Sequence, residues 1–131
     1  DNAFAAMAIC YEIVYPELVR KQAIRADVLI TISNDSWFGA SIGPFQHLEI
    51  ARMRALENGR WLLRATNNGI TGIVDHRGAI KSVMPQFEAG VLRDSYALMS
   101  GRTPFNKFGE LPVLVLLLLL LVPSVYIRFL R

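Results

Sequence analysis

The stretch that decides the fold is AFAAMAICYEIVYPELVRKQAIRADVLITIS, residues 3–33. Residues 3–10 form a continuous apolar run, which is typical of a strand buried on both faces. Pro16 marks the start of a helix, and residues 27–33 are short, apolar and rich in β-branched side chains. A strand, a helix and a second strand within about thirty residues form a βαβ unit. The sequence therefore predicts an α/β protein with parallel strands.

The following residues continue this alternation of helices and strands. Residues 34–45 are turn-rich, and residues 46–60 carry apolar side chains at helical spacing, with Gly59 as a C-cap. Short apolar runs then predict a meander of three strands, at 61–66, 70–75 and 79–84. Turn residues separate these strands, NNG at 67–69 and HRG at 76–78. Residues 86–110 are expected to hold a further strand and a linker.

Composition limits the classes of protein that this chain can represent. Its 131 residues suffice for one domain with a core, and the net charge is +3. The arginines are scattered rather than gathered with aromatic residues in a basic stripe, so we expect no nucleic acid partner. The single cysteine, Cys10, excludes an intrachain disulfide. Because the chain starts without Met and within a predicted strand, we expect it to be part of a longer protein.

The C-terminal sequence LPVLVLLLLLLVPSVYIRFLR, residues 111–131, is the most apolar part of the chain. Residues 111–127 carry no charge and would measure about 25 Å as a helix, close to the thickness of a bilayer core. A buried core helix is the alternative, but a soluble helix normally carries a polar face. The sequence therefore predicts a transmembrane helix. Arg128 and Arg131 follow it, so the positive-inside rule assigns residues 128–131 to the cytoplasm.

Cys10 ends the first predicted strand, where the chain turns into a helical segment. A free cysteine is often a buried packing residue, and this interpretation stays open. Ligand sites in open α/β sheets lie at the carboxyl ends of strands, so Cys10 is also a candidate nucleophile. The backbone N–H of Tyr11 would then bind an oxyanion, and Glu12 is close in the sequence. The residues around Cys10 do not identify a base for its thiol.

The two histidines do not complete a catalytic pair with the cysteine. His47 starts a predicted helix and His76 lies in a hairpin turn, so both are interpreted as surface or capping residues. One cysteine and two distant histidines lack the spacing of zinc ligands. We therefore predict neither a metal site nor a cofactor.

The loop at 34–45 carries two aromatic residues, Trp37 and Phe38, at the edge of the sheet where the site would lie. They either pack in the core or line an apolar substrate channel, and both interpretations stay open. Asn34 and Asp35 are expected to organise the loop through side-chain to backbone hydrogen bonds. Arg52 and Arg54 in the next helix are expected either to be solvated or to pair with Glu49 and Glu57, which stand at helical spacing from them.

Several motifs together resemble one family. They are ICYE at 9–12, VLITISNDSWFG at 28–39, GPFQHLEIARMRALENGRWLLRATNNGITGIVDHRG at 43–78 and the apolar C-terminal segment. These motifs resemble the apolipoprotein N-acyltransferases, a membrane-embedded branch of the nitrilase, or carbon–nitrogen hydrolase, superfamily. The resemblance extends from Met7 to the end of the chain.

The resemblance implies part of a four-layer α-β-β-α sandwich, followed by one C-terminal transmembrane helix, on the periplasmic side of the bacterial inner membrane. It implies a catalytic Glu, Lys and Cys, with Cys10 as the nucleophile and with the Glu and Lys preceding residue 1. Tyr11 would supply its backbone N–H to the oxyanion, and Glu12 would support the site. Trp37 and Phe38 would bind substrate near the lipid entrance. The implied parts are a C-terminal portion of the catalytic domain at 1–100, a linker at 101–110, the transmembrane helix at 111–127 and a cytoplasmic tail at 128–131.

The activity that the resemblance implies is acyl transfer in two steps. A fatty acyl chain would pass from a phospholipid, such as phosphatidylethanolamine, to Cys10, and from that thioester to the N-terminal amine of a diacylglyceryl-cysteine apolipoprotein. The expected partners are the phospholipid, the apolipoprotein and the bilayer, with the protein a monomer and this chain alone inactive. Two alternatives stay open, a membrane-anchored nitrilase or amidase that hydrolyses a small amide, and a non-catalytic membrane-tethered scaffold.

Overall fold

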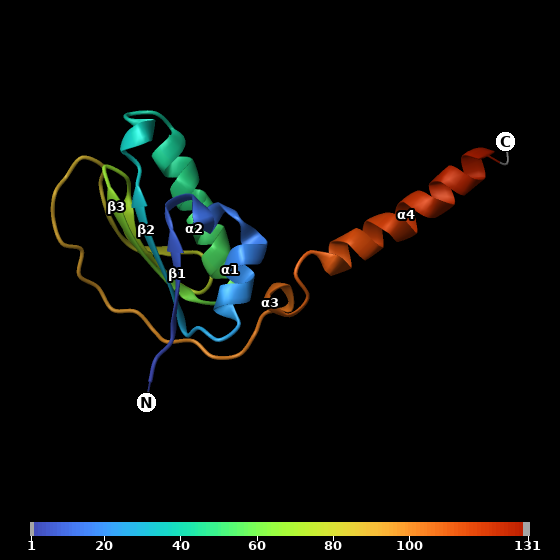
Figure 1. The fold of residues 1–131 in the computed structure, drawn as a ribbon, viewed down its shortest axis with the longest axis horizontal. Helices are drawn as coiled ribbons and strands as arrows, with labels where there is room; N and C mark the ends of the chain where they lie inside the picture. Colours follow the sequence, from blue (N-terminus) through green and yellow to red (C-terminus); the bar gives the residue numbers. More distant parts are fainter. Residues whose placement is uncertain (1, 130–131) are drawn as a thin grey trace.

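A mixed β-sheet organises the fold. The computed structural model describes residues 2–129, with side chains up to Val122. The described residues form a five-stranded sheet in the order β1-β2-β3-β4-β5 (Figure 1). The strands are β1 (Ala5–Ile9), β2 (Val28–Asn34), β3 (Trp61–Asn67), β4 (Thr71–Val74) and β5 (Ile80–Met84). The first three are parallel, and β4 and β5 are antiparallel to their neighbours, so the predicted α/β class is confirmed.

Two helices connect the parallel strands, α1 (Pro16–Ala23) and α2 (Gly43–Asn58). Pro16 is the first residue of α1, where its missing N–H has no consequence. Gly59 ends α2 in the left-handed conformation, with φ of 61°, as the sequence predicts. Right-handed crossovers that step along a sheet in one direction place their helices on the same face. Figure 1 shows α1 and α2 on one face of the sheet accordingly.

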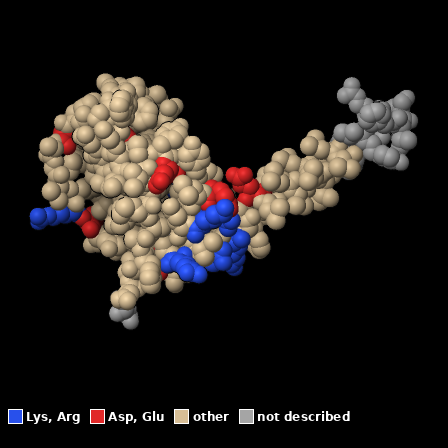
Figure 2. All heavy atoms as spheres, in the orientation of Figure 1, with Lys and Arg blue, Asp and Glu red and all other residues tan. Residues whose placement is uncertain are grey.

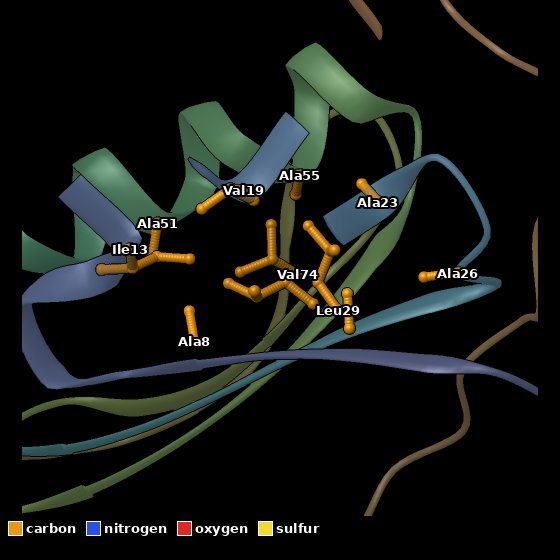
Figure 3. Packing of buried hydrophobic residues seen from close by; sticks show 11 residues of the cluster. Ala8, Ile13, Val19, Ala23, Ala26, Leu29, Ala51, Ala55 and Val74 are labelled. Atoms are coloured by element: carbon orange, nitrogen blue, oxygen red, sulfur yellow. The ribbon is translucent and has the colours of Figure 1, made fainter. Parts of the chain in front are cut away.

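The core lies between these helices and the sheet (Figure 3). In β1, Ala6 and Ala8 are buried in this core, whereas Met7 and Ile9 are exposed on the other face. The larger buried side chains are Ile13, Val19, Leu29, Leu62 and Val74. The helices contribute mostly alanines, Ala23, Ala51 and Ala55. These small side chains let the helices lie close to the sheet.

The face opposite the helices is only partly covered. Met7, Ile9 and Ile32 are exposed on it. Residues 90–96 run along this face and, with side chains from β2, β3 and β4, line a cavity of about 630 Å³. Cys10 does not line this cavity, so the volume of the cavity does not make it the candidate active site.

The prediction of a further strand within 86–110 is wrong. Residues 85–103 contain neither helix nor strand. Part of this segment crosses the face of the sheet instead of following an edge, so its backbone cannot extend the hydrogen-bond ladder. The short helix α3 (Pro104–Phe108) lies in the predicted linker.

The linker is tied to the helical layer through Asn106, which is fully buried. Its Nδ2 donates to Oδ1 of Asn58 at 2.9 Å, and Nη1 of Arg20 donates to its backbone carbonyl at 3.0 Å. Both partners belong to the helices that cover the sheet. The segment that leads to the C-terminal helix is therefore held to the domain by polar contacts.

The last helix, α4 (Leu111–Phe129), extends away from the domain (Figure 1). Its described side chains, up to Val122, carry no charge, and the visible side of this part of the helix is uncharged in Figure 2. Among the residues that the structure describes, no helix is long and apolar enough to cross a membrane. The transmembrane helix over 111–127 stays a prediction. Its end, 123–127, and the predicted tail, 128–131, lie outside the described side chains.

Candidate active site

Cys10 occupies a strained turn at the carboxyl end of β1. Its φ is 53°, a left-handed value that residues other than glycine rarely adopt. The 3-10 helix η1 (Cys10–Val14) begins at this residue. Oε2 of Glu12 accepts the N–H of Ile9 at 2.7 Å, which ties the turn to the strand just before the cysteine. Such backbone strain costs roughly 1–3 kcal/mol and is common at functional sites.

Tyr11 is the second residue of η1. The first N–H groups of a helix have no partner within that helix, so the Tyr11 N–H belongs to a set that can stabilise an oxyanion formed beside Cys10. The Tyr11 side chain is 55% exposed. Its ring centroid lies 6.2 Å from that of Tyr15 and 6.3 Å from that of His47.

A group of buried polar side chains lies next to the thiol. The register of β1 and β2 pairs Ile9 with Ile32, which brings the next two residues, Cys10 and Ser33, together. Oγ of Ser33 lies 3.6 Å from Sγ of Cys10 and 2.5 Å from Oδ1 of Asp35. Ser33 therefore connects the cysteine to a buried carboxylate.

Asp35, His47 and Arg64 form what we call the Asp35 cluster. Nη2 of Arg64 donates to Oδ2 of Asp35 at 2.7 Å, and Nδ1 of His47 lies 3.0 Å from Oδ1. Because a carboxylate only accepts, the second contact is a hydrogen bond when Nδ1 carries the ring proton. All three side chains are buried. The cluster thus balances an internal negative charge with an internal positive one.

Electrostatics connects Arg64 to both neighbours. Burial lowers the pKa of the Arg64 guanidinium, and the Asp35 carboxylate opposes that shift through its charge and its hydrogen bond. The charge of a Cys10 thiolate also raises the pKa of Arg64, so the two groups interact. Because the guanidinium does not lose its proton in proteins, the site contains a buried cation near the thiol.

The aromatic residues of the loop lie in η2 (Ser36–Phe38). Trp37 is 87% exposed and is not part of the core. Phe38 is half-buried, and its ring centroid lies 6.2 Å from that of His47. Phe38 and His47 share a groove of about 100 Å³ with Tyr11 and residues of η1 and α2. The structure thus brings Phe38 to the rim of the candidate site, while Trp37 projects into solvent.

Two sequence interpretations at this site are wrong. His47 is neither a surface nor a capping residue, because α2 begins at Gly43 and the histidine lies one turn inside it, buried against Asp35. The carboxylate of Asp35 does not bond to the backbone of the loop, because its partners are the side chains of Ser33, His47 and Arg64. Asn34 does accept the backbone N–H of Ser36 at 3.2 Å, as expected.

The remaining polar predictions lie away from the thiol. Arg52 pairs with Glu49 at 2.6 Å and Arg54 with Glu57 at 2.8 Å, as the helical spacing predicts. His76 lies in the turn between β4 and β5. Within the described part of the chain, no group of histidine, cysteine and acidic residues could hold a metal ion.

Ser33 and Arg64 are the residues that sequence reasoning did not select for the site. Arg64 had a signal, because a charged residue in the middle of the apolar run WLLRAT needs a buried partner. Asp35 at the end of the neighbouring strand is that partner. Ser33 had no signal, since its contact depends on the register between β1 and β2.

Together these features define an α/β protein with a candidate thiol nucleophile on a strained turn at the end of a parallel strand. Residues 3–97 match the carbon–nitrogen hydrolase family. The chain belongs to that family. A crystal structure of a carbon–nitrogen hydrolase from Helicobacter pylori G27 is similar, with a TM-score of 0.57 over 68% of this chain and 42% of that chain. Its sequence identity of 18% means that this likeness concerns the fold alone.

Curated relatives share much higher identity. The chain is 53% identical over 105 residues to the apolipoprotein N-acyltransferase of Pseudomonas paraeruginosa, covering 80% of this chain and 20% of that protein. It is 54% identical over 112 residues to the apolipoprotein N-acyltransferase of Shewanella oneidensis, covering 85% of this chain and 22% of that protein. The chain therefore spans about a fifth of the length of these relatives.

Proposed function

We propose that this chain contributes the nucleophile of an apolipoprotein N-acyltransferase. Cys10 takes a fatty acyl chain from a phospholipid such as phosphatidylethanolamine and passes it to the N-terminal amine of a diacylglyceryl-cysteine apolipoprotein. The observation that carries this proposal is the strained conformation of Cys10 at the carboxyl end of β1. The similarity to proteins named apolipoprotein N-acyltransferase supports the choice of substrates.

The proposed chemistry has two balanced halves. In the first, the Cys10 thiolate attacks the ester carbonyl, a C–S bond forms, the ester C–O bond breaks, and lysophospholipid leaves as an alcohol with the proton. In the second, the acceptor amine attacks the thioester carbonyl, a C–N bond forms, the C–S bond breaks, and the amine proton returns to the thiol. The Tyr11 N–H stabilises the oxyanion in both halves. No cofactor is needed, because the acyl group itself is the activated species.

The general base and a second cation are proposed to come from a Glu and a Lys outside this chain. A second sheet would cover the face that exposes Met7, Ile9 and Ile32, which gives the four-layer sandwich. Because Cys10 lies at the carboxyl edge of the first sheet, residues carried by a covering layer would be able to reach its thiol. Glu12 keeps the turn in place from within the chain.

The proposed location is the periplasmic side of the bacterial inner membrane, with residues 111–127 as a transmembrane helix and the protein a monomer. Both substrates are amphiphiles, so a site at the bilayer surface avoids moving an acyl chain through water. Exposed Trp37 and half-buried Phe38 would guide that chain to Cys10. The topology is tested in spheroplasts with an impermeant thiol reagent, on variants that lack other cysteines. Ser100→Cys should react and Arg131→Cys should not, and the reverse pattern would overturn the orientation.

The acyl-enzyme provides the direct test of function. The full-length protein is incubated in phosphatidylethanolamine vesicles without acceptor, and the peptide that contains Cys10 is analysed by mass spectrometry. We expect the mass of one fatty acyl chain on this peptide, removable by neutral hydroxylamine. Addition of a diacylglyceryl-cysteine peptide should transfer the chain to its amine. Cys10→Ser should reduce transfer by orders of magnitude, and Cys10→Ala should abolish labelling.

Three outcomes would replace the proposal with its alternatives. Release of free fatty acid in place of the amide, or hydrolysis of a small amide with no acyl transfer, would identify a hydrolase. Undiminished transfer by Cys10→Ala would return Cys10 to a packing role. Full growth of the Cys10→Ala strain, together with no acyl transfer by the wild-type protein, would favour a non-catalytic scaffold.

A further inference from the structure

The contact between Ser33 and Cys10 belongs to a continuous polar path. Oγ of Ser33 lies within reach of both Sγ of Cys10, at 3.6 Å, and Oδ1 of Asp35, at 2.5 Å. Behind Asp35 stand Nη2 of Arg64 at 2.7 Å and Nδ1 of His47 at 3.0 Å. The path therefore leads from the half-exposed thiol into a fully buried ion pair.

A serine hydroxyl has one hydrogen and two acceptor lone pairs. It cannot donate to Asp35 and to Cys10 at the same time. With Cys10 as a neutral thiol, the shorter contact to the carboxylate takes the hydrogen, and Oγ is left to accept the S–H. With Cys10 as a thiolate, the sulfur needs a donor, and rotation of the hydroxyl supplies one. Ser33 thus has a hydrogen-bonding role in each protonation state of the sulfur.

The Asp35 cluster makes this rotation feasible. When Ser33 turns its hydrogen to sulfur, Asp35 keeps the hydrogen bond from Nη2 of Arg64, and also that from Nδ1 of His47 when this nitrogen carries the ring proton. The carboxylate is therefore not left without a donor. Nη1 of Arg64 and Nε2 of His47 are buried and have no hydrogen-bond partner among the described residues. The guanidinium of Arg64 is therefore only partly engaged by Asp35, and its charge interacts with that of a thiolate at Cys10.

We propose that Ser33 is a positioning residue for Cys10. Its hydroxyl accepts a hydrogen bond from the neutral thiol and donates one to the thiolate, and the Asp35 cluster supports this exchange. The inference rests on the proposed function in that Cys10 is the nucleophile. The charged and titratable groups around the thiol are Glu12, which is bound to the N–H of Ile9, and the members of the Asp35 cluster. Tyr11 presents an exposed side chain beside them.

The test measures alkylation of Cys10, which requires no acyl transfer. The full-length protein in detergent micelles is treated with iodoacetamide across the pH range in which a thiol titrates, and modification of the peptide that contains Cys10 is quantified by mass spectrometry. Ser33→Ala removes the donor to the thiolate. It should raise the pH of half-maximal alkylation by about one unit, equivalent to about a tenfold loss of reactive anion at lower pH. Ser33→Thr keeps a hydroxyl at the same place and should restore the original profile.

Asp35→Asn provides a second variant with the opposite expected sign. It removes a negative charge near sulfur and weakens the competing acceptor, so the pH of half-maximal alkylation should fall. Ser100→Ala, which removes a hydroxyl from an exposed residue of the segment 85–103, is the matched control and should leave the profile unchanged. A merely structural role for Ser33 would not shift the two site variants in opposite directions.

The alkylation profiles decide whether Ser33 positions Cys10. An unshifted profile in Ser33→Ala, or a Ser33→Thr profile equal to that of Ser33→Ala, would overturn the proposal. If Ser33→Ala does not fold, a Ser33→Thr profile that differs from the wild type or an Asp35→Asn profile that does not fall would do the same. If the alkylation shifts appear but no acyl-enzyme forms with phospholipid, the positioning role stands and the proposed function fails.

Discussion

Asp35→Ala should destabilise the protein more than the double variant in which Arg64 is also replaced by Met. The single change leaves a buried guanidinium with a hydrogen bond from Nε to the carbonyl of Ile70, at 3.2 Å, but without its carboxylate. An uncompensated buried charge costs about 3–5 kcal/mol. In the double variant the charge is gone and the Met side chain fills much of the space. The remaining losses are the hydrogen bonds of Asp35 with His47 and Ser33 and that of Arg64 with Ile70, which contribute about 1 kcal/mol each. The two Asp35 bonds are also lost in the single variant, so the uncompensated charge is what separates the two variants.

The expected coupling between the two sites is therefore about 2 kcal/mol or more. It is measured by urea unfolding of the detergent-solubilised protein followed by tryptophan fluorescence, since the free energy of unfolding falls linearly with denaturant. Arg64→Met alone completes the cycle, and it should also be strongly destabilising because it leaves Asp35 buried and half-paired.

The matched control is the pair Arg52 and Glu49, which has a similar contact distance of 2.6 Å but lies on the surface. Surface ion pairs contribute about 0–1 kcal/mol, so Glu49→Ala combined with Arg52→Met should show little coupling. If the double variant loses as much free energy of unfolding as Asp35→Ala and Arg64→Met together, the argument that the two charges compensate each other in the interior is refuted.

Three further predictions concern the rest of the helical layer. Burial raises the pKa of Glu57 above its ordinary value of 4.5. Between pH 4.5 and the raised pKa, the folded state holds a proton that the unfolded state has lost, so the free energy of unfolding should fall as the pH rises through this range. Urea titrations at several pH values should show this fall in the wild type and not in Glu57→Gln. Asn106→Ala leaves Oδ1 of Asn58 unsatisfied, costs about 1–3 kcal/mol, and should speed proteolysis within 100–110. Gly59→Ala should lower the urea midpoint by the equivalent of about 1 kcal/mol or more, because φ is 61° and the new Cβ would lie 2.9 Å from Cγ2 of Thr103.

The strands and helices of the domain could be predicted because their signals are local. An apolar run before Cys10, Pro16 at a helix start and Gly59 at a helix end are each explained by neighbouring residues in the sequence. Local signals gave a wrong prediction for the segment 86–100. Its apolar residues suggest a strand, but the part at 90–96 contacts the face of the sheet, and only the tertiary structure determines whether an extended segment meets an edge or a face.

The residues of the candidate site likewise include some that local sequence signals identify and some that only the tertiary structure identifies. Cys10 can be identified from the sequence because the end of a strand is recognisable there, whereas Ser33 cannot, because its contact depends on the register of β1 and β2. The interpretation of His47 depends on where the helix begins. Placing that start at 46 makes His47 a terminal residue, and the observed start at Gly43 moves it inside the helix and into the core. A small boundary error therefore concealed a functional candidate.

The polar character of the Asp35 cluster is itself an argument for a role at Cys10. A buried ion pair such as that of Asp35 and Arg64 is often no more stable than apolar residues of similar volume. The core beside it, with Leu62 and Val74, shows that this sheet accommodates apolar packing without difficulty. Stability alone therefore does not explain two charges and a histidine at this place. Their position, with Asp35 directly after β2, Arg64 in the middle of β3 and His47 in α2, is linked through Ser33 to the strained turn of Cys10. This position is explained if the sulfur becomes an anion during the reaction. A cluster of this kind, already held in place by the fold, can stabilise that charge without reorganising its surroundings.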